Sequence, residues 1–298
     1  MKTEKWIAEN CASLSGRVIA VSGSTGGLGR ELCRHLAGLG AELILLDRST
    51  ERSMRLGEEL KADFPTLTVS YVRVDMTDFS SVRDAVARLE ESAVDTLVLN
   101  AGAYHIPRFK TDLGIDNVFQ INCAAPYYIA KRLLPTLRAR GGRVVAVGSI
   151  AHRYSRVDPS DEDFTTRTKP SLVYGNAKRR MMYSMMSLGE GVSIVHPGIT
   201  FTNITSHYPK LIFALIKHPM KVIFMKPRRA ALSILAGIYR DTAHSEWIGP
   251  RLFDVWGLPR VSRLRGCDES EQDHIVSRAE EMYRKMETHE FSDNDLSL

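Results

Sequence analysis

Short apolar runs alternate along the chain with longer stretches in which apolar residues recur every three or four positions. The short runs contain mainly Val, Ile and Leu and show no regular polar alternation. Such runs are typical of strands covered on both faces, as in a parallel sheet. The pattern predicts six strands: Arg17–Ser22, Ala41–Leu46, Thr68–Val74, Val94–Leu99, Arg143–Val147 and Val192–His196.

The longer stretches between these runs predict helices. The first carries Leu32, His35 and Leu36 at the spacing of one helical face. Because strand and helix alternate regularly, right-handed β-α-β crossovers are expected. The predicted fold class is α/β, a doubly wound parallel sheet of the Rossmann type with a C-terminal extension. The predicted helices are Gly29–Leu39, Thr50–Asp63, Phe79–Ser92, Thr111–Arg138 and Ser171–Leu188.

The chain continues well beyond the sixth run. Ala230–Tyr239 predicts another packed helix, and Trp247–Phe253 predicts a final edge strand. Residues 266–298 predict a charged helix followed by a frayed tail. No linker and no repeat of fixed period divides residues 1–298, so we expect a single domain.

A glycine-rich loop, SGSTGGLG, follows the first predicted strand at residues 22–29. Gly23 permits a tight turn, Gly27 permits close approach to a pyrophosphate, and Gly29 lets the next helix pack near the strand. That helix directs its N-terminal N–H groups and positive dipole end at the loop. A plain turn is the alternative, but the position between strand and helix favours a dinucleotide site. The hydroxyl donors of the loop are Ser22, Ser24 and Thr25.

Two opposite charges, Asp47 and Arg48, end the second predicted strand. They stand about 20 residues after the loop, where an acid that binds the adenosine ribose is expected. The charge of Asp47 would repel a 2′-phosphate, which favours NAD. A guanidinium at Arg48 would instead pair with that phosphate or stack on adenine, unless it is an ordinary solvated side chain. We expect NAD or NADP as cofactor, with NAD slightly favoured.

Tyr174 and Lys178, in the sequence YGNAK, lie one helical turn apart and share a face. A nearby ammonium lowers the pKa of a phenol, so Tyr174 can exchange a proton with an alcohol or carbonyl. This spacing also arises often by chance. Ser149 strengthens the interpretation because it follows the fifth predicted strand, at the sheet edge where ligands bind. Asn122 interrupts an apolar helix, and a water relay to Lys178 would satisfy its amide.

These motifs occur in the order found in the short-chain dehydrogenase/reductase family, which the chain resembles over roughly residues 16–202. The long interval between Ser149 and Tyr174 is similar to that of the retinol-dehydrogenase-like members, which often favour NADP. The resemblance implies that Tyr174 is the general acid/base and that Lys178 lowers its pKa and binds the nicotinamide ribose. It further implies that Ser149 orients the substrate oxygen and that Asn122 supports a proton relay.

The same resemblance implies a set of cofactor contacts. Asp75 would contact the adenine, Asn100 and Gly102 would shape the groove, and Pro197 with Gly198 would hold the nicotinamide side. The implied cofactor-binding residues are Ser22, Gly23, Thr25, Gly27, Leu28, Gly29, Asp47, Arg48, Asp75, Met76, Asn100, Ala101, Gly102, Tyr174, Lys178, Pro197, Gly198 and Thr202.

Residues 203–229 are implied to form a helical lid over the substrate. Two apolar clusters in this segment, Leu211–Ile216 and Val222–Met225, predict an apolar alcohol or carbonyl substrate. A basic amphipathic patch on a membrane surface and an ordinary core helix are the alternatives. The basic residues compatible with peripheral membrane contact are Lys210, Lys217, Lys221, Lys226, Arg228 and Arg229.

Composition narrows the class of protein. Of 298 residues, 44% are hydrophobic and 25% are charged, as in ordinary globular proteins. The net charge of +5 admits a pyrophosphate but does not indicate nucleic acid. The four cysteines show no metal-binding spacing, so no metal is expected. The N-terminus has no apolar signal region, and no run approaches the ~20 apolar residues of a membrane span, so a cytoplasmic location is expected.

The favoured function is an NAD(P)-dependent oxidoreductase that interconverts an alcohol and a ketone or aldehyde. One alternative is a regulatory protein that binds the cofactor on the same fold without turnover. An epimerase or dehydratase of nucleotide sugars is a weaker alternative, because those relatives usually have a different glycine spacing. The resemblance also implies a homodimer or homotetramer that pairs through Thr111–Arg138 and Ser171–Leu188.

Overall fold

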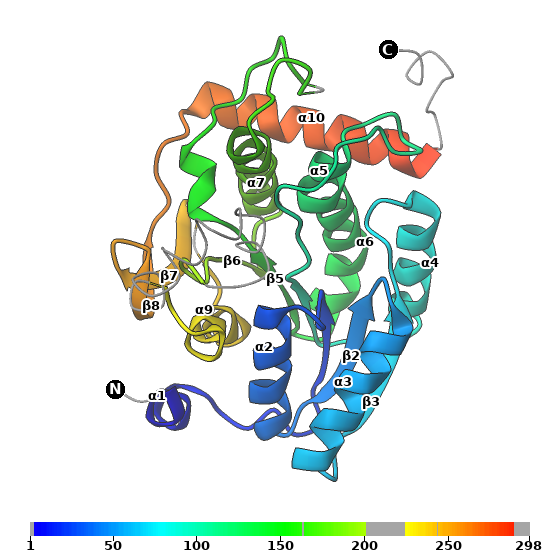
Figure 1. Cartoon of the computed structure of the whole chain (residues 1–298), viewed down its shortest axis with the longest axis vertical. Coiled ribbons are helices and arrows are strands. Elements are labelled where there is room, and N and C mark those ends of the chain that lie inside the picture. Colours follow the sequence, from blue (N-terminus) through cyan, green and yellow to red (C-terminus); the bar gives the residue numbers. More distant parts are fainter. Residues whose placement is uncertain (1–2, 163, 201–223, 243, 289–298) are drawn as a thin grey trace, which may run out of the picture.

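The computed structural model describes residues 3–162, 164–200, 224–242 and 244–288. They contain an eight-stranded sheet with the order β3-β2-β1-β4-β5-β6-β7-β8 (Figure 1). All neighbouring strands are parallel except β7 and β8, which are antiparallel. The order runs outward from β1 in both directions, which confirms the doubly wound prediction. The strands are β1 Val18–Ser22, β2 Glu42–Asp47, β3 Val69–Arg73, β4 Thr96–Leu99, β5 Arg143–Val147, β6 Val192–Val195, β7 Glu246–Leu252 and β8 Trp256–Arg263.

Helices cover both faces of the sheet (Figure 1). On one face α2, α3 and α9 bury residues such as Leu36, Leu56 and Leu235 against the strands. On the other face α4, α6 and α7 bury residues such as Val82 and Leu133. The described helices are α1 Thr3–Asn10, α2 Gly27–Gly38, α3 Thr50–Asp63, α4 Phe79–Glu90, α5 Asn117–Phe119, a π-helical turn Gln120–Ala124, α6 Ala125–Ala139, a 3₁₀ turn Ile150–Arg153, α7 Pro170–Ser187, α9 Pro227–Tyr239 and α10 Glu269–Thr288.

The last two strands differ from the prediction. The predicted edge strand Trp247–Phe253 corresponds to β7, which lies inside the sheet, and β8 forms the edge. The sequence of β8, WGLPRVSR, contains glycine, proline and arginines and therefore has no strand pattern. Pro259 is tolerated there because an edge strand does not need every backbone N–H for pairing.

The long predicted helix Thr111–Arg138 also begins later than expected. Residues 111–116 form a turn closed by an isolated bridge between Lys110 and Asp116. The carboxylate of Asp116 then accepts hydrogen bonds from the backbone N–H groups of Val118 and Phe119, and the helix begins at Asn117. An N-cap of this type fixes the start of a helix.

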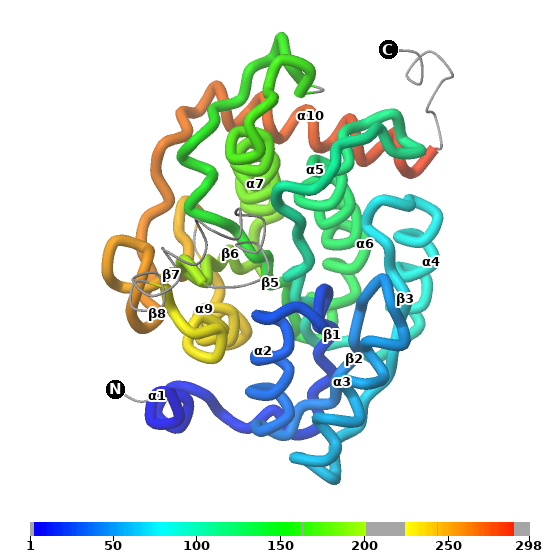
Figure 2. The backbone as a smooth tube through the Cα atoms, in the orientation of Figure 1, coloured from blue at the N-terminus to red at the C-terminus, as the bar shows by residue number. Residues whose placement is uncertain are grey.

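The C-terminal helix α10 lies across α6 and α7 as a third layer (Figure 2). Ion pairs join it to both helices: Lys131 and Arg132 of α6 contact Glu280 and Glu287, and Arg179 of α7 contacts Glu271. α10 therefore covers part of the outer surface of α6 and α7, the helices on which oligomer contacts were expected. Pairing through these helices stays a prediction.

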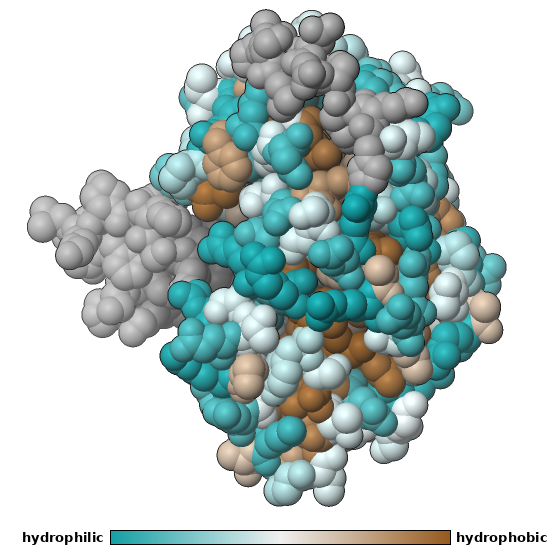
Figure 3. Space-filling view, turned by 90° about the vertical axis from the view of Figure 1, so that its right-hand side faces the viewer, coloured by the Kyte–Doolittle hydropathy of each residue, from teal (hydrophilic) through white to brown (hydrophobic). Residues whose placement is uncertain are grey.

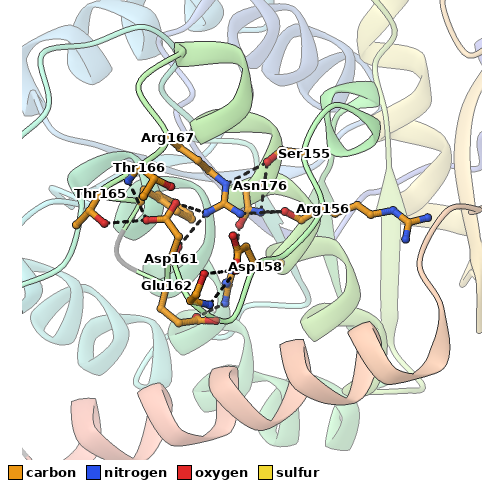
Figure 4. Close-up of polar contacts among 12 residues, drawn as sticks. Ser155, Arg156, Asp158, Asp161, Glu162, Thr165, Thr166, Arg167 and Asn176 are labelled. Atoms are coloured by element: carbon orange, nitrogen blue, oxygen red, sulfur yellow. Dashed lines mark hydrogen bonds and ion pairs between the residues drawn. The ribbon is translucent and has the colours of Figure 1, made fainter.

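The insertion between Ser149 and Tyr174 is folded against α7 by polar contacts (Figure 4). Asp161 is buried, forms an ion pair with Arg167 at 2.5 Å, and accepts hydrogen bonds from Thr165 and Thr166. Asn176 of α7 donates a hydrogen bond to the backbone carbonyl of Arg156 at 2.7 Å. The described residues of the insertion therefore lie against the helix that carries Tyr174.

The side of the molecule at the right of Figure 1, which carries α4, is mixed in character. Hydrophilic side chains predominate there, with smaller hydrophobic areas between them (Figure 3). A surface of this kind is ordinary for a folded protein.

Candidate active site

The glycine loop turns between β1 and α2 as predicted. Gly23 has a φ of +66°, and a Cβ atom on it would lie 2.9 Å from the Cα of Ala101. A Cβ atom on Gly29 would lie 2.2 Å from the carbonyl oxygen of Gly23. Only glycine fits these two positions, because any side chain would displace the backbone of the loop.

The N-terminus of α2 has no side-chain cap, since its N-cap residue is Gly26. By contrast, Ser49 caps α3 and Asp78 caps α4 through their side chains. An uncapped helix N-terminus leaves its first N–H groups available to an anion. The residues present therefore fit the pyrophosphate of a dinucleotide, with Gly27 and Leu28 in the first turn.

Ser22 and Asn100 join the loop to the end of β4. The hydroxyl oxygen of Ser22 accepts hydrogen bonds from the backbone N–H groups of Asn100 and Ala101, each at 3.0 Å. The side-chain amide of Asn100 donates to the backbone carbonyls of Ser22 and Gly23, each at 3.0 Å. These four bonds hold the first and fourth strand ends in register around the expected cofactor groove.

Asp47 makes contacts that the sequence did not reveal. One carboxylate oxygen accepts hydrogen bonds from the hydroxyl groups of Ser24 and Ser53. The other accepts from Thr25, from its backbone N–H at 3.2 Å and from its hydroxyl at 2.9 Å. The carboxylate is buried, and its hydrogen bonds with Ser24 and Thr25 hold the glycine loop in place. Arg48, the next residue, is exposed.

Asp75 and Met76 follow β3 at the same edge of the sheet. One carboxylate oxygen of Asp75 accepts hydrogen bonds from the backbone N–H and the hydroxyl of Thr77. The carbonyl of Met76 accepts a hydrogen bond from the side-chain amide of Gln120 at 3.0 Å. Gln120 is fully buried in the π-helical turn, and sequence reasoning missed it because a single Gln carries no distinctive pattern.

Asn122 lies in the π-helical turn and is fully buried. Its amide donates hydrogen bonds to the carbonyls of Ala103 and Val118, each at 2.8 Å, and its oxygen accepts from the N–H of Ala103. A Cβ atom on Gly102 would lie 2.9 Å from this oxygen and 3.5 Å from Nζ of Lys178. Asn122 and Lys178 therefore flank the same glycine, and π-helical turns frequently occur at functional sites.

Ser149, Tyr174 and Lys178 come together where β5 ends. Ser149 caps the 3₁₀ turn, since its hydroxyl oxygen accepts the N–H of Ala151 at 3.2 Å. The ammonium of Lys178 is buried and donates to the carbonyl of Val147 at 2.9 Å. Tyr174 is half-buried, with the ring of Tyr104 edge-on at 5.3 Å.

The pKa values of the pair do not follow the prediction. Burial raises the pKa of Tyr174 to about 12; hydrogen bonding with Ser149 opposes this shift, and Tyr104 adds to it. Burial lowers the pKa of Lys178 to about 8. The expected lowering of the pKa of Tyr174 by Lys178 is therefore wrong for this arrangement, because the ammonium is directed at Val147 and desolvation dominates.

Pro197 and Gly198 lie at the end of β6. Gly198 has a φ of +84°, and a Cβ atom on it would lie 2.7 Å from the carbonyl oxygen of Val255 in the β7–β8 turn. Thr202 and residues 203–223 of the predicted lid lie outside the described residues. Residues 227–229, which the lid prediction included, begin α9.

His152 is a further residue that sequence reasoning missed. It is buried, and its Nδ1 atom donates a hydrogen bond to the carbonyl of Ser149 at 2.8 Å. Its position three residues after Ser149 was the available signal. Among the described residues, no group of three or more His, Cys, Asp or Glu side chains could hold a metal ion.

Comparison with known proteins identifies similar chains. The model of the short chain dehydrogenase family matches residues 17–158. An uncharacterised oxidoreductase of Schizosaccharomyces pombe is 29% identical over 79% of this chain and 76% of its own length. Retinol dehydrogenase 13 of Homo sapiens is 26% identical over 66% of this chain and 62% of its own length. Polyprenol dehydrogenase of Mus musculus is 26% identical over 78% of both chains.

Solved structures share the fold. An uncharacterised protein of Mycobacterium paratuberculosis has a TM-score of 0.70 at 24% identity, over 96% of this chain and 98% of that one. The complex of Pseudomonas aeruginosa RhlG with NADP has a TM-score of 0.57 at 24% identity, over 77% and 93% of the two chains. These similarities extend to the sheet and its flanking helices.

Proposed function

Because the chain belongs to the short chain dehydrogenase family, we propose that it is an NAD(P)-dependent oxidoreductase that interconverts an alcohol and a ketone or aldehyde. One observation carries the proposal. The glycine loop contacts the Ala101–Gly102 turn, and Gly102 is flanked by Asn122 and Lys178. A continuous set of contacts therefore leads from the expected phosphate site to the residues with acid–base chemistry.

The proton chemistry is assigned to Tyr174. With a pKa of about 12 its phenol is protonated at neutral pH and is available to donate to a carbonyl oxygen. Ser149 accepts the N–H of Ala151 and hydrogen-bonds with Tyr174, so its hydroxyl would orient the same substrate oxygen that Tyr174 protonates. Lys178 and Asn122 would hold the ribose and the proton relay. The bound nicotinamide would supply or accept the hydride.

An apolar substrate is proposed from the surroundings of Tyr174. A small hydrophobic cluster formed by Val118, Phe164, Val173 and Ala177 packs beside its ring, with Ile106 at the margin. Phe164 is fully buried and comes from the insertion, so the insertion contributes to this cluster. The names of two relatives, retinol dehydrogenase and polyprenol dehydrogenase, refer to apolar alcohols and support the same substrate class.

Turnover with a graded panel of carbonyls tests the proposed function. We expect oxidation of NADH or NADPH with retinoid, steroid and long-chain aldehyde substrates, and kcat/KM should increase with apolar surface. Cofactor binding is measured separately by calorimetry. Tight cofactor binding without turnover of any carbonyl or alcohol would instead support the regulatory alternative.

We further propose NADP(H) as the preferred cofactor. Two features support this choice over the NAD preference inferred from sequence. The carboxylate of Asp47 already accepts four hydrogen bonds from Ser24, Thr25 and Ser53, which leaves it less available to the ribose. Arg48 is exposed beside it, and among the described residues no acidic group pairs with it.

Arg48→Gln is expected to weaken NADPH binding about tenfold or more, because one charged hydrogen bond to the 2′-phosphate is lost. The affinity for NADH should stay nearly unchanged. Calorimetric titration of both cofactors checks this result, with Arg88→Gln on the exposed face of α4 as the control. If the substitution weakens both cofactors equally, Arg48 does not select between them.

A further inference from the structure

The turn between β7 and β8 is unusually apolar for an exposed position. Six large hydrophobic residues are exposed in the described part of the chain, and three of them lie in this turn, between residues 252 and 256. Leu252 is 48% exposed, Phe253 is 88% exposed and Trp256 is 39% exposed. The turn forms the outer limit of the sheet beside β8 (Figure 2). We refer to residues 251–256 as the hairpin tip.

The backbone conformation of the hairpin tip is unfavourable for a bulky residue, so the needs of folding do not explain the presence of Phe253. Val255 donates a hydrogen bond to the carbonyl of Leu252 at 3.0 Å, which closes a tight turn. The two central residues, Phe253 and Asp254, have φ values of +52° and +58°. Asn, Asp and Gly are favoured in such a turn, and a bulky residue at positive φ is strained. Phe253 is thus both strained and exposed, a combination that points to a function outside the fold.

Basic side chains surround the hairpin tip. Arg251 belongs to it, and Arg229 lies over the ring of Trp256 at 4.5 Å. Arg153 forms an ion pair with Asp254 at 2.8 Å. Lys226 follows Met225, whose sulfur accepts a hydrogen bond from Gly257. The tip and its basic rim, Arg153, Lys226 and Arg229, thus contain four cations with Arg251 included and the one carboxylate of Asp254. The net charge of this surface is about three positive charges.

The hairpin tip also lies beside the candidate active site. Since β7 is parallel to β6, its C-terminal end is at the same sheet edge as Pro197 and Gly198. The carbonyl of Val255 accepts a hydrogen bond from the N–H of Ile199 at 3.3 Å. Arg153, which holds Asp254, belongs to the turn that follows Ser149.

We propose that the hairpin tip docks on a membrane surface that contains anionic lipids, with Leu252, Phe253 and Trp256 in the interfacial layer and the basic rim against the headgroups. Exposed aromatic and aliphatic side chains with flanking cations suit this environment. A second copy of the chain fits less well, because two rims of the same charge would repel each other. None of the described helices is long and apolar enough to cross a bilayer.

Vesicle flotation tests the proposal without reference to turnover, so its outcome is independent of the proposed function. The full-length protein should bind vesicles of phosphatidylcholine with phosphatidylserine and bind pure phosphatidylcholine vesicles more weakly. Leu252→Ser combined with Phe253→Asn should reduce binding more than tenfold. Arg251→Gln should reduce it about fivefold, and only on the anionic vesicles.

Two controls separate docking from a structural role. Phe253→Asn places a favoured residue in the turn, so it should raise the melting temperature while it weakens vesicle binding. Met54→Ser on α3 removes a side chain as exposed as Leu252, at 48%, and should leave vesicle binding unchanged. The proposal is overturned if wild type binds neither vesicle or if the tip variants bind as wild type does. Loss of a dimer in sedimentation on changing the tip, without loss of vesicle binding, would assign the surface to a second copy.

Discussion

Tyr174→Phe is expected to lower kcat for carbonyl reduction by about 10²–10⁴, the usual contribution of a general acid. The substitution removes only the phenolic O–H, and the ring keeps its edge-on contact with Tyr104 at 5.3 Å. With its pKa raised to about 12, this phenol stays protonated at neutral pH, and Ser149 and Tyr104 are the neighbouring groups that carry an O–H. Stopped-flow or steady-state measurement of NADPH oxidation with a saturating apolar aldehyde checks the loss.

The control for this prediction is a tyrosine without a role at the site. Tyr154→Phe changes a side chain that is 56% exposed and should leave kcat within about twofold of wild type. Cofactor affinity and melting temperature should be similar in the wild type and in both variants. Retention by Tyr174→Phe of more than a tenth of the wild-type kcat would assign the proton transfer to another group.

The sheet was largely predictable from sequence because five of the six predicted strands, β1, β2, β4, β5 and β6, are buried on both faces. A strand that is buried on both faces requires a continuous apolar run such as VIAVS in β1, and such a run can be recognised in the sequence alone. The edge strand β8 has no such requirement, so its glycine, proline and arginines give no strand pattern. The start of α5 was missed for a different reason, because it depends on the cap formed by Asp116.

The glycine loop of the candidate site follows from the sequence, because local geometry requires glycine at Gly23 and Gly29, whereas the roles of Ser149 and Tyr174 stay predictions. The interactions among the candidate residues were less predictable. The partners of Asp47 were not predictable, because Ser24 and Ser53 reach it from two separate elements. The pKa of Tyr174 depends on burial by residues distant in sequence, so the motif alone gave the wrong direction.

Arg179 is another residue whose importance depends on distant partners. It follows Lys178 in α7, yet its guanidinium is 2% exposed and points to α10. Glu271 accepts two hydrogen bonds from it, at 2.6 and 2.5 Å. The guanidinium also donates to the carbonyls of His152 and Gly266. One side chain thus joins the helix of Tyr174, the turn after Ser149 and the C-terminal helix.

Arg179→Met is expected to lower the free energy of unfolding by about 3–5 kcal/mol, the usual cost of leaving one member of a buried ion pair without its partner. Urea denaturation measures this loss. As a control, Arg55→Met breaks an exposed pair with Glu51 on α3 and should cost less than about 0.5 kcal/mol. The double variant Arg179→Met, Glu271→Gln should be more stable than the sum of the two single losses, because neither charge is then left alone.

The pH dependence of the free energy of unfolding tests the role of the Arg179–Glu271 ion pair in a second way. Burial alone would raise the pKa of Glu271, but hydrogen bonds from Arg179 and the backbone of Val157 outweigh it and the pKa falls below the ordinary value of 4.5. A carboxylate with a lowered pKa in the folded state stabilises the protein above that ordinary value, and this contribution is lost as the pH falls through the folded-state pKa. The stability difference between wild type and the double variant should therefore be constant from neutral pH down to about 5 and narrow in more acidic solution. A difference that stays constant into strong acid would show that packing of the long arginine side chain, and not its charge, joins α7 to α10.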